Sequence, residues 1–311
     1  MQTPREALTP DALALLQGVA RSGSFAAAAR ELGLVPSAVT YRIRQIEDAL
    51  DVLLFDRSSR RAQLTEAGAE LLREGDRLLL EIDAVANRVK RVATGWESQL
   101  TIAVDTVISW PTMMELAEAF FALAPATRLR LRDESLSGTL EALTSGQADL
   151  ALGVALDPGT SAGIQSNVLG EVGFVYAVAP HHPLAAMQGV LKDDLVQKHR
   201  AIAVADSVQR GTALTRGLLA GQDVLTVPTM RAKLDAQLRG LGGGFVPEPM
   251  ARPYVESGRL VVKEVQRSAR LVRLTYAWRS SDSAGRALQW WLGQLESPAT
   301  RRALLEQHFR A

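Results

Sequence analysis

The chain has 311 residues, with 35 Lys and Arg against 34 Asp and Glu, and a formal net charge of +1. So small a net charge excludes nonspecific polyanion binding by the whole molecule, and any attraction to a polyanion must come from local clusters of arginine. The length is typical of two domains with a connector, and a hydrophobic content of 47% is sufficient for globular cores. Because there is no cysteine, disulfides, thiolate nucleophiles and cysteine zinc sites are excluded.

Membrane and export segments are not expected. The first residues, MQTPREALTP, contain no apolar signal region, and no uninterrupted apolar stretch approaches the length of a membrane span. We therefore expect a cytoplasmic protein with no membrane partner.

The first predicted helix starts at Pro10, with Thr9 as its cap. Leu13, Leu16 and Val19 recur at helical spacing and are expected to lie beneath the two helices that follow. These three helices would form one small core.

Residues 22–50 predict two helices joined by a tight turn. Ser24 is a good N-cap for an alanine-rich helix over residues 25–32, and Gly33 ends it. Pro36 opens a second helix that continues to about Leu50, because a missing amide hydrogen costs nothing in the first turn. Its core face is Val39, Ile43, Ile46 and Leu50.

The opposite face of this second helix is chemically suited to DNA. Its hydroxyl, phenol, guanidinium and amide groups hydrogen-bond base edges and phosphates, and a helix of this length can enter the major groove, which is about 12 Å wide. An ordinary amphipathic helix with a solvated basic face is the alternative, since helix-turn-helix geometry also occurs outside DNA binding. The polar side chains of this face are Ser37, Thr40, Tyr41, Arg42, Arg44 and Gln45.

A basic hairpin after this helix favours DNA binding over the alternative. Phe55, Asp56 and Arg57 close an apolar run, and residues 58–61 form a basic turn before Leu64, which is consistent with a wing whose arginines bind phosphate. The predicted DNA-binding residues are Ser24, Pro36, Ser37, Thr40, Tyr41, Arg42, Arg44, Gln45, Arg57, Arg60 and Arg61.

A long helix without proline is predicted from Thr65 to about Ala93. Its apolar residues fall on alternating four- and three-residue steps after the first heptad, which predicts a dimerisation seam, with packing on its own chain as the alternative. Gly75 would lie on the seam, permitting close approach or a bend. Two recognition helices related by a two-fold axis could then read half-sites about 34 Å, or a multiple of that distance, apart. The seam residues are Leu71, Leu78, Ile82, Val85, Val89 and Val92.

Strands and helices alternate beyond a boundary near residues 94–96. Strands over 100–105, 129–133 and 149–154 with helices over 111–123 and 137–145 predict one α/β lobe. Strands over 174–178, 201–205, 224–227 and 244–246 with helices near Leu214 and Leu234 predict a second. Strands over 260–265 and 271–278 and a helix from about Ala284 complete the chain, and one of these segments is expected to cross back to the first lobe.

A ligand cleft is expected at the carboxyl ends of the strands, where helix N-termini offer free amides. Several of its candidates have structural alternatives: Ser109, Ser137 and Thr229 as helix caps and Trp110 as core. Asp105 would repel a small carboxylate, so an aromatic, neutral or cationic effector is equally consistent, with Trp110 able to stack against it. The candidate effector-binding residues are Asp105, Thr106, Ser109, Trp110, Ser137, Gly153, Asp206, Thr229 and Pro247.

Enzyme motifs are missing from the sequence. The four histidines form no HExxH pattern, and no GxSxG elbow is present. The glycines at 240 and 242–244 are not followed by Lys-Ser or Lys-Thr, so a helix C-cap and close packing are favoured over a phosphate loop. We expect no catalytic activity, no metal and no cofactor.

Six segments together resemble the LysR-type transcriptional regulators. They are GSFAAAARELG, SAVTYRIRQIE followed by LLFDR, LTEAGAELL, QADLALG, APHHPLA and LRGLGGGFVP, and they span nearly the whole chain. Val35 and Pro36 stand where many members have serine and glutamine, which leaves base preference open, and Asp51 replaces a frequent glycine in a turn.

The resemblance implies an α+β protein with three parts. A winged helix-turn-helix would occupy residues 1–64 and a linker and dimerisation helix residues 65–95. A two-lobed α/β effector domain over residues 96–311, with crossing strands, would resemble type 2 periplasmic binding proteins. It also implies a dimer or tetramer on an interrupted palindrome at promoters, a small-molecule effector in the cleft, and RNA polymerase as a partner. A soluble small-molecule sensor or binding protein without specific DNA binding is the alternative.

Overall fold

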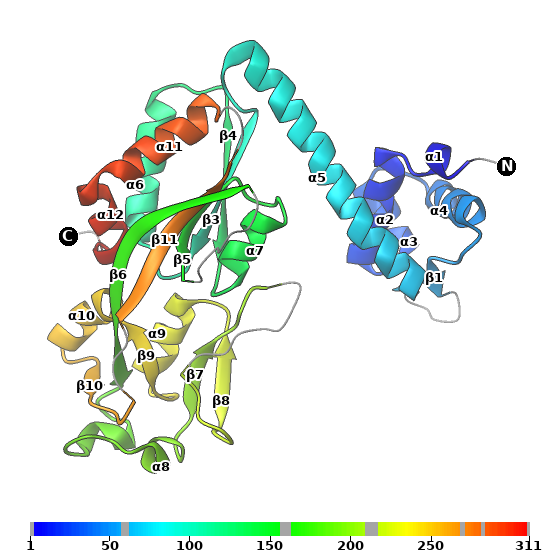
Figure 1. Ribbon diagram of the computed structural model, residues 1–311. Coiled ribbons are helices and arrows are strands. Elements are labelled where there is room, and N and C mark those ends of the chain that lie inside the picture. Colours follow the sequence, from blue (N-terminus) through cyan, green and yellow to red (C-terminus); the bar gives the residue numbers. More distant parts are fainter. Residues whose placement is uncertain are drawn as a thin grey trace. The chain divides into compact units, whose positions relative to one another are not determined.

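The computed structural model describes residues 3–56, 62–155, 163–208, 217–267, 271–280 and 284–309. The chain divides into two units, Met1–Val89 and Lys90–Ala311, and the long helix α5 (Glu66–Thr94) runs from the first into the second (Figure 1). Among the described residues, no helix combines the length and apolarity needed to cross a membrane.

The first unit consists of helices and a short hairpin. The predicted caps are confirmed: Thr9 Oγ1 accepts the amide of Ala12 at 3.2 Å, and Ser24 Oγ accepts the amide of Ala27 at 3.0 Å. A two-residue antiparallel ladder forms the wing strands, which confirms the hairpin after the second helix. The elements are α1 (Pro4–Ala7), α2 (Pro10–Ser22), α3 (Phe25–Glu31), α4 (Pro36–Leu50), β1 (Phe55–Asp56) and β2 (Gln63–Leu64).

The core of the first unit is built on the predicted faces. Leu16 and Val19 of α2 are fully buried against Val39 of α4, and Ala28 on α3 has no bulk to separate the helices. Asp51 ends α4 in the left-handed conformation at φ +54°, which Asp tolerates better than most residues. Asp51, which stands in place of a glycine, therefore preserves the turn.

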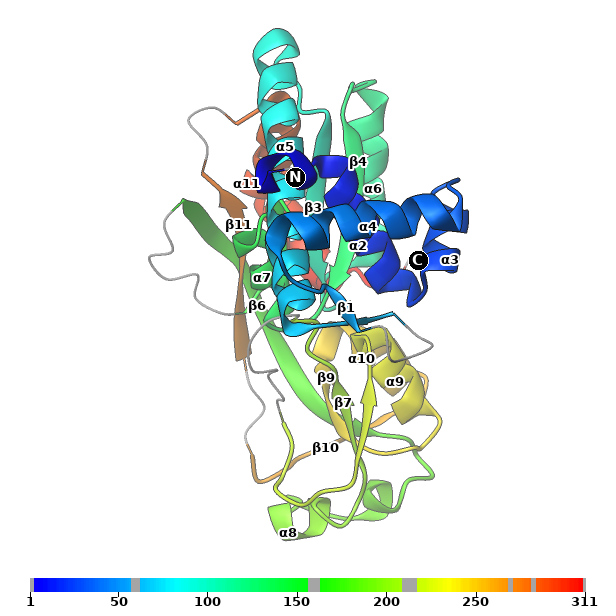
Figure 2. The same ribbon diagram turned by 90° about the vertical axis from the view of Figure 1, so that its right-hand side faces the viewer.

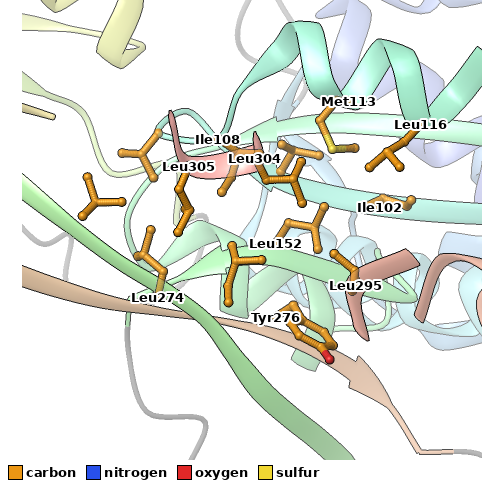
Figure 3. Packing of buried hydrophobic residues seen from close by; sticks show 14 of the residues in the cluster. Ile102, Ile108, Met113, Leu116, Leu152, Leu274, Tyr276, Leu295, Leu304 and Leu305 are labelled. Atoms are coloured by element: carbon orange, nitrogen blue, oxygen red, sulfur yellow. The ribbon is translucent and has the colours of Figure 1, made fainter. Parts of the chain in front are cut away.

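The second unit contains a first lobe with a parallel sheet of three strands. β3 pairs with β4 and β5, and the alternation of strand side chains divides the helices between two faces. Ile102 belongs to the hydrophobic cluster that includes Met113 of α6 and Leu304 of α12 (Figure 3). Ala103 packs instead with α7. The elements are β3 (Gln99–Asp105), α6 (Trp110–Ala122), β4 (Arg128–Glu134), α7 (Gly138–Thr144), β5 (Leu150–Val154), α11 (Arg286–Glu296) and α12 (Pro298–Glu306).

A second lobe contains the remaining sheet strands. β9 and β10 pair with β6, and β7 pairs with β8 in parallel. A 3-10 turn at Pro183–Ala186 precedes α8. The elements are α8 (Asp193–Val196), β7 (Ala201–Val204), β8 (Val224–Val227), α9 (Met230–Leu238), β9 (Gly244–Pro247), α10 (Glu248–Glu256) and β10 (Val261–Lys263).

Two antiparallel strands join the lobes: β6 (Ile164–Val178) and β11 (Leu271–Arg279) run side by side from one lobe into the other (Figure 1). The predicted crossing by a C-terminal strand is confirmed for β11. The prediction for residues 174–178 was too short, because β6 starts at Ile164. Gly170, with a register shift opposite it, interrupts the regular alternation that identifies a strand.

Four helices, α1, α8, α10 and α12, were absent from the sequence prediction. α10 contains Pro253 in its interior, and proline is the usual mark of a helix end. The helix predicted near Leu214 lies outside the described residues.

Candidate DNA-binding and effector sites

The outer face of α4 presents most of the predicted DNA-binding side chains. Pro36, Ser37, Thr40, Tyr41, Arg42 and Arg44 are exposed, and Gln45 and Ser24 are half-buried. Ser24 serves as the cap of α3. Thr40 donates its hydroxyl to the Pro36 carbonyl at 3.0 Å. Arg57, Arg60 and Arg61 lie outside the described residues.

Arg42 and Arg44 form no ion pair within the part of the chain that the structure describes. An unpaired, exposed guanidinium is ready for bidentate bonds to phosphate or guanine without first breaking a salt bridge. By contrast, Arg21 on α2 is paired with Glu31 at 2.9 Å. The free arginines of this unit therefore include those of the recognition face.

A buried glutamate fixes the wing relative to α4. Glu47 is 4% exposed, and its Oε1 accepts the amide of Leu54 at 2.9 Å, immediately before β1. Phe55 of β1 packs edge-on against Phe25 at the start of α3, with 5.2 Å between the ring centroids. α4 and β1 are seen in Figure 2. The wing and the recognition helix thus share one core.

The apolar stripe of α5 separates into two parts. Leu71 is half-buried against the core of the first unit, whereas Leu78, Ile82, Val85, Val89 and Val92 are exposed. The first three of these exposed residues line a groove with Leu8 and Leu13. A Cβ on Gly75 would come 3.1 Å from Leu13, so this glycine lets α5 approach α2 of its own chain.

A cavity of about 160 Å³ lies between the lobes of the second unit. Of the predicted effector residues, Asp105, Thr106 and Gly153 line it. Gly153 has φ +86°, and a Cβ there would come 2.8 Å from Asp105, so a larger residue would be strained and crowded. Most of the other lining residues are apolar, from β6, β11 and the second lobe.

Asp105 is buried and already has three hydrogen-bond donors. Its carboxylate accepts the amides of Val107 at 3.0 Å and Leu136 at 3.1 Å, and the hydroxyl of Thr139 at 3.3 Å. Burial raises the pKa of Asp105 to about 7, and these hydrogen bonds oppose the rise. The side chain therefore braces the loops of the first lobe as well as lining the cavity.

Six of the predicted effector residues are not among the lining residues. Ser109 is fully buried, caps α6 and donates its hydroxyl to the Gln307 carbonyl, while Thr229 caps α9 by accepting the amide of Ala232 at 3.1 Å. Trp110 is 40% exposed at the start of α6, and Pro247 ends β9. Ser137 and Asp206 contact each other instead.

Polar residues that the sequence analysis missed line the second-lobe side. Lys233 and Gln222 are at most 9% exposed, and burial lowers the pKa of Lys233 to about 8. Tyr176 Oη is buried with no hydrogen-bond partner in the described chain, and burial raises its pKa to about 12. Tyr176 lies directly opposite Phe245 in the β6–β9 ladder, so the two rings lie on the same face of the sheet. Lys233 lies beside the neighbouring residue, Gly244, which belongs to the opposite face.

An inter-lobe contact joins Asp206 and Ser207 of the second lobe to residues 134–138 of the first. Asp206 Oδ1 accepts the amides of Ser137 at 3.1 Å and Gly138 at 3.3 Å, and Ser137 Oγ donates to Asp206 Oδ2. Ser207 Oγ accepts the amide of Ser135 at 2.8 Å and donates to Glu134 at 2.7 Å. A Cβ on Gly138 would overlap Ser207 Oγ, so glycine permits this approach.

Among the described residues, no group of three or more His, Asp or Glu side chains is arranged so that it could hold a metal ion.

Comparison with known proteins assigns both units. Residues 10–69 match the bacterial regulatory helix-turn-helix proteins of the lysR family, and residues 93–298 match the LysR substrate binding domain. The chain belongs to the LysR family of transcriptional regulators. It therefore combines a helix-turn-helix DNA-binding domain with an effector-binding domain, and the family prediction from the sequence is confirmed.

Relatives of this LysR-type regulator match over most of their length. The probable HTH-type transcriptional regulator YhaJ of Escherichia coli K12 is 38% identical over 93% of this chain and 96% of its own. YeeY of the same strain, an uncharacterized HTH-type transcriptional regulator, is 34% identical over 92% of each chain. Full-length CbnR complexed with its target DNA matches 93% of this chain and 99% of CbnR, with a TM-score of 0.58 and 18% identity, which shows a shared fold.

The inter-lobe contact of this LysR-type regulator yields a first prediction. Asp206→Ala removes the acceptor of the Ser137 amide, and a hydrogen bond to a carboxylate contributes about 1.5 to 3 kcal/mol. Amide exchange at Ser137 is therefore expected to accelerate about tenfold or more, measured by hydrogen–deuterium exchange, and less at Gly138, whose amide also donates to the Ser135 carbonyl at 3.1 Å. Asp223→Ala, at an exposed ion pair with Arg200, is the control. Unchanged exchange at residue 137 would show that the contact does not hold the lobes together in solution.

Proposed function

We propose that this LysR-type regulator binds an interrupted palindrome at promoters as a dimer or tetramer, and that a small molecule in the cleft between its lobes regulates it. The observation that carries the DNA-binding part is the exposed, unpaired arginine face of α4 beside the β1–β2 wing. This proposal includes all the DNA-binding residues predicted from the sequence, also those that lie outside the described chain. It further includes a cytoplasmic location, RNA polymerase as a partner and the lack of catalytic activity.

The exposed stripe on α5 supports dimerisation. Val89 is 65% exposed and Val92 88% exposed, which is costly for consecutive seam positions of a helix that stays single. A partner helix on this stripe would cover them by coiled-coil packing. Two recognition helices would then lie on one face of a two-fold dimer and read half-sites about 34 Å apart or a multiple of that spacing.

The cavity supports effector control. It lies between two lobes that touch through residues 134–138 and 206–207, so a ligand inside it contacts both lobes. A ligand that prefers one arrangement of the lobes shifts the population toward that arrangement, with typical coupling energies of about 1 to 3 kcal/mol.

A footprint of the purified protein on its own upstream DNA, repeated across salt concentrations, tests the proposal. A protected two-fold symmetric site whose affinity falls steeply with salt is the expected result. No protection at low salt would contradict DNA binding and favour the soluble sensor, which retains ligand affinity without salt-dependent binding.

Arg42→Ala is expected to weaken binding to the protected site by about 1 to 3 kcal/mol, roughly 5- to 150-fold, and to relax preference at particular bases. The reason is that Arg42 is exposed and unpaired on the face of α4. Fluorescence anisotropy on the site and on single-base variants measures both effects. Arg239→Ala, an exposed arginine of the second unit, is the matched control. Equal losses on every sequence would reassign Arg42 to phosphate contact.

A further inference from the structure

A buried cation without a counter-ion lines the cavity between the lobes. Lys233 lies on α9, one turn after its cap Thr229, and is 6% exposed. Its Nζ forms no hydrogen bond or ion pair with any residue in the described parts of the chain. Because buried charges in proteins are normally paired, the missing anion has to come from outside these residues.

Gly244 keeps the space beside this ammonium open. A Cβ at Gly244 would lie 3.2 Å from both Nζ and Cε of Lys233 and 3.0 Å from the Ile202 carbonyl oxygen. The φ of Gly244 is not in the left-handed region, so the backbone does not require glycine here. The glycine permits the close approach of the Ile202 backbone and also leaves room next to Nζ.

The other charged side chains of the cavity wall have partners. Arg267 donates to Asp193 at 3.2 Å and to the carbonyls of Gly217 and Leu218, and Asp105 accepts three hydrogen bonds. Within the described lining, Lys233 is therefore the charged group that a ligand can neutralise. A second negative charge on the ligand would face Asp105 without a cation of its own.

The size and the lining of the cavity limit the rest of the ligand. A cavity of about 150 Å³ accommodates benzene, so about 160 Å³ suits a molecule with one small ring or a short branched chain. Met230, Val204 and Leu274 are among the apolar side chains that line it. The part of the ligand away from Lys233 is accordingly mainly apolar.

We propose that Lys233 is the residue that selects the charge of the effector: the ligand is a monoanionic organic molecule of about the size of benzoate, with its anionic group at Lys233 and Gly244. This proposal rests on the proposed function, because it takes the cavity to be the effector site. The sequence left the charge of the effector open, because Asp105 would repel a small carboxylate, and this proposal selects the anion.

Thermal unfolding of the full-length protein with benzoate or its uncharged isostere benzamide, each at about 50 mM and neutral pH, tests the proposal. Burial lowers the pKa of Lys233 only to about 8, so the amine is mostly charged under these conditions. A dissociation constant near 1 mM would raise the melting temperature of the second unit by about 4 °C or more with benzoate. Benzamide is expected to produce less than a quarter of this shift.

Lys233→Met keeps the length and the apolar stem of the side chain and removes its charge. This variant is expected to fold, since it removes a buried unpaired charge, and to lose the benzoate shift. Lys198→Met, at an exposed lysine of the same lobe, is expected to keep it. Equal shifts with benzoate and benzamide, an unchanged benzoate shift in Lys233→Met, or no shift of the wild type with benzoate would each overturn the proposal.

Failure of this proposal can be distinguished from failure of the proposed function. The footprint without any added small molecule tests DNA binding alone, whereas the benzoate shift tests the cavity alone. If the footprint is observed but Lys233 does not select the charge of the ligand, the protein is a LysR-type regulator with an effector of another class. If Lys233 selects the charge of the ligand but no footprint is observed, the protein is an anion-binding sensor.

Discussion

Phe55→Ala is expected to destabilise the DNA-binding unit by about 3 to 5 kcal/mol and to lower its affinity for DNA at least tenfold. Phe55 is 1% exposed, and its ring packs against Phe25. The truncation leaves a cavity where β1, α3 and α4 meet, in a unit small enough that a few kcal/mol is much of its total stability. Urea denaturation followed by far-UV circular dichroism measures the first effect, and fluorescence anisotropy at fixed salt measures the second.

Phe121→Ala is the matched control for this prediction. Phe121 is 54% exposed on α6 of the second unit, so its truncation should leave the first unfolding transition and the DNA affinity unchanged. If Phe55→Ala unfolds at the same urea concentration as the wild type, the wing strand does not belong to the core of the DNA-binding unit.

The helices of the DNA-binding unit could be predicted from the sequence because their signals are local. Thr9 and Ser24 cap helices that start within a residue of the expected position, and Val39, Ile43 and Ile46 are buried at helical spacing. Capping and amphipathic periodicity depend on neighbours along the chain, so one sequence contains the information. Which bases the exposed face of α4 contacts depends on the docked DNA and stays a prediction.

The cavity could be predicted only in part, because its lining comes from segments far apart in the sequence. Asp105 and Thr106, at the end of β3, line the cavity, and their role in binding an effector stays a prediction. Ser109, one turn further, points away and caps α6, since a residue at a helix start can satisfy either the helix or a ligand. No local pattern distinguishes these two roles.

Lys233 had no signal in the sequence. A lysine inside a predicted helix is normally solvated, and MRAKLDAQL has no clear polar and apolar faces because α9 is buried on more than one side. The glycines beside it gave the nearest signal. Their sequence context predicts close packing, and they do lie against Arg200, Ile202 and Tyr176, but Gly244 also borders the ammonium group.

The stability of the effector unit is expected to fall by about 3 kcal/mol between pH 4 and pH 7 through Asp105 alone. Burial raises the pKa of Asp105 from 3.8 to about 7, so the folded state retains a proton that the unfolded chain has already released. A group whose pKa is raised on folding contributes its stability below the unfolded value and loses it as the pH rises through the folded value. Asp105→Asn does not titrate, so the difference in unfolding free energy between wild type and variant should change by this amount across the interval.

Lys233 is expected to produce the opposite slope at higher pH. Its pKa falls from 10.5 to about 8 on folding, so the folded state releases its proton first, and stability rises by about 3 kcal/mol between pH 8 and pH 10.5. Lys233→Met should abolish this rise and leave the Asp105 slope in place, while Asp105→Asn should do the reverse. Urea denaturation at closely spaced pH values measures both slopes. If both variants followed the wild-type profile at every pH, neither side chain would be buried as the structure places it, and the charge selection proposed for Lys233 would lose its basis.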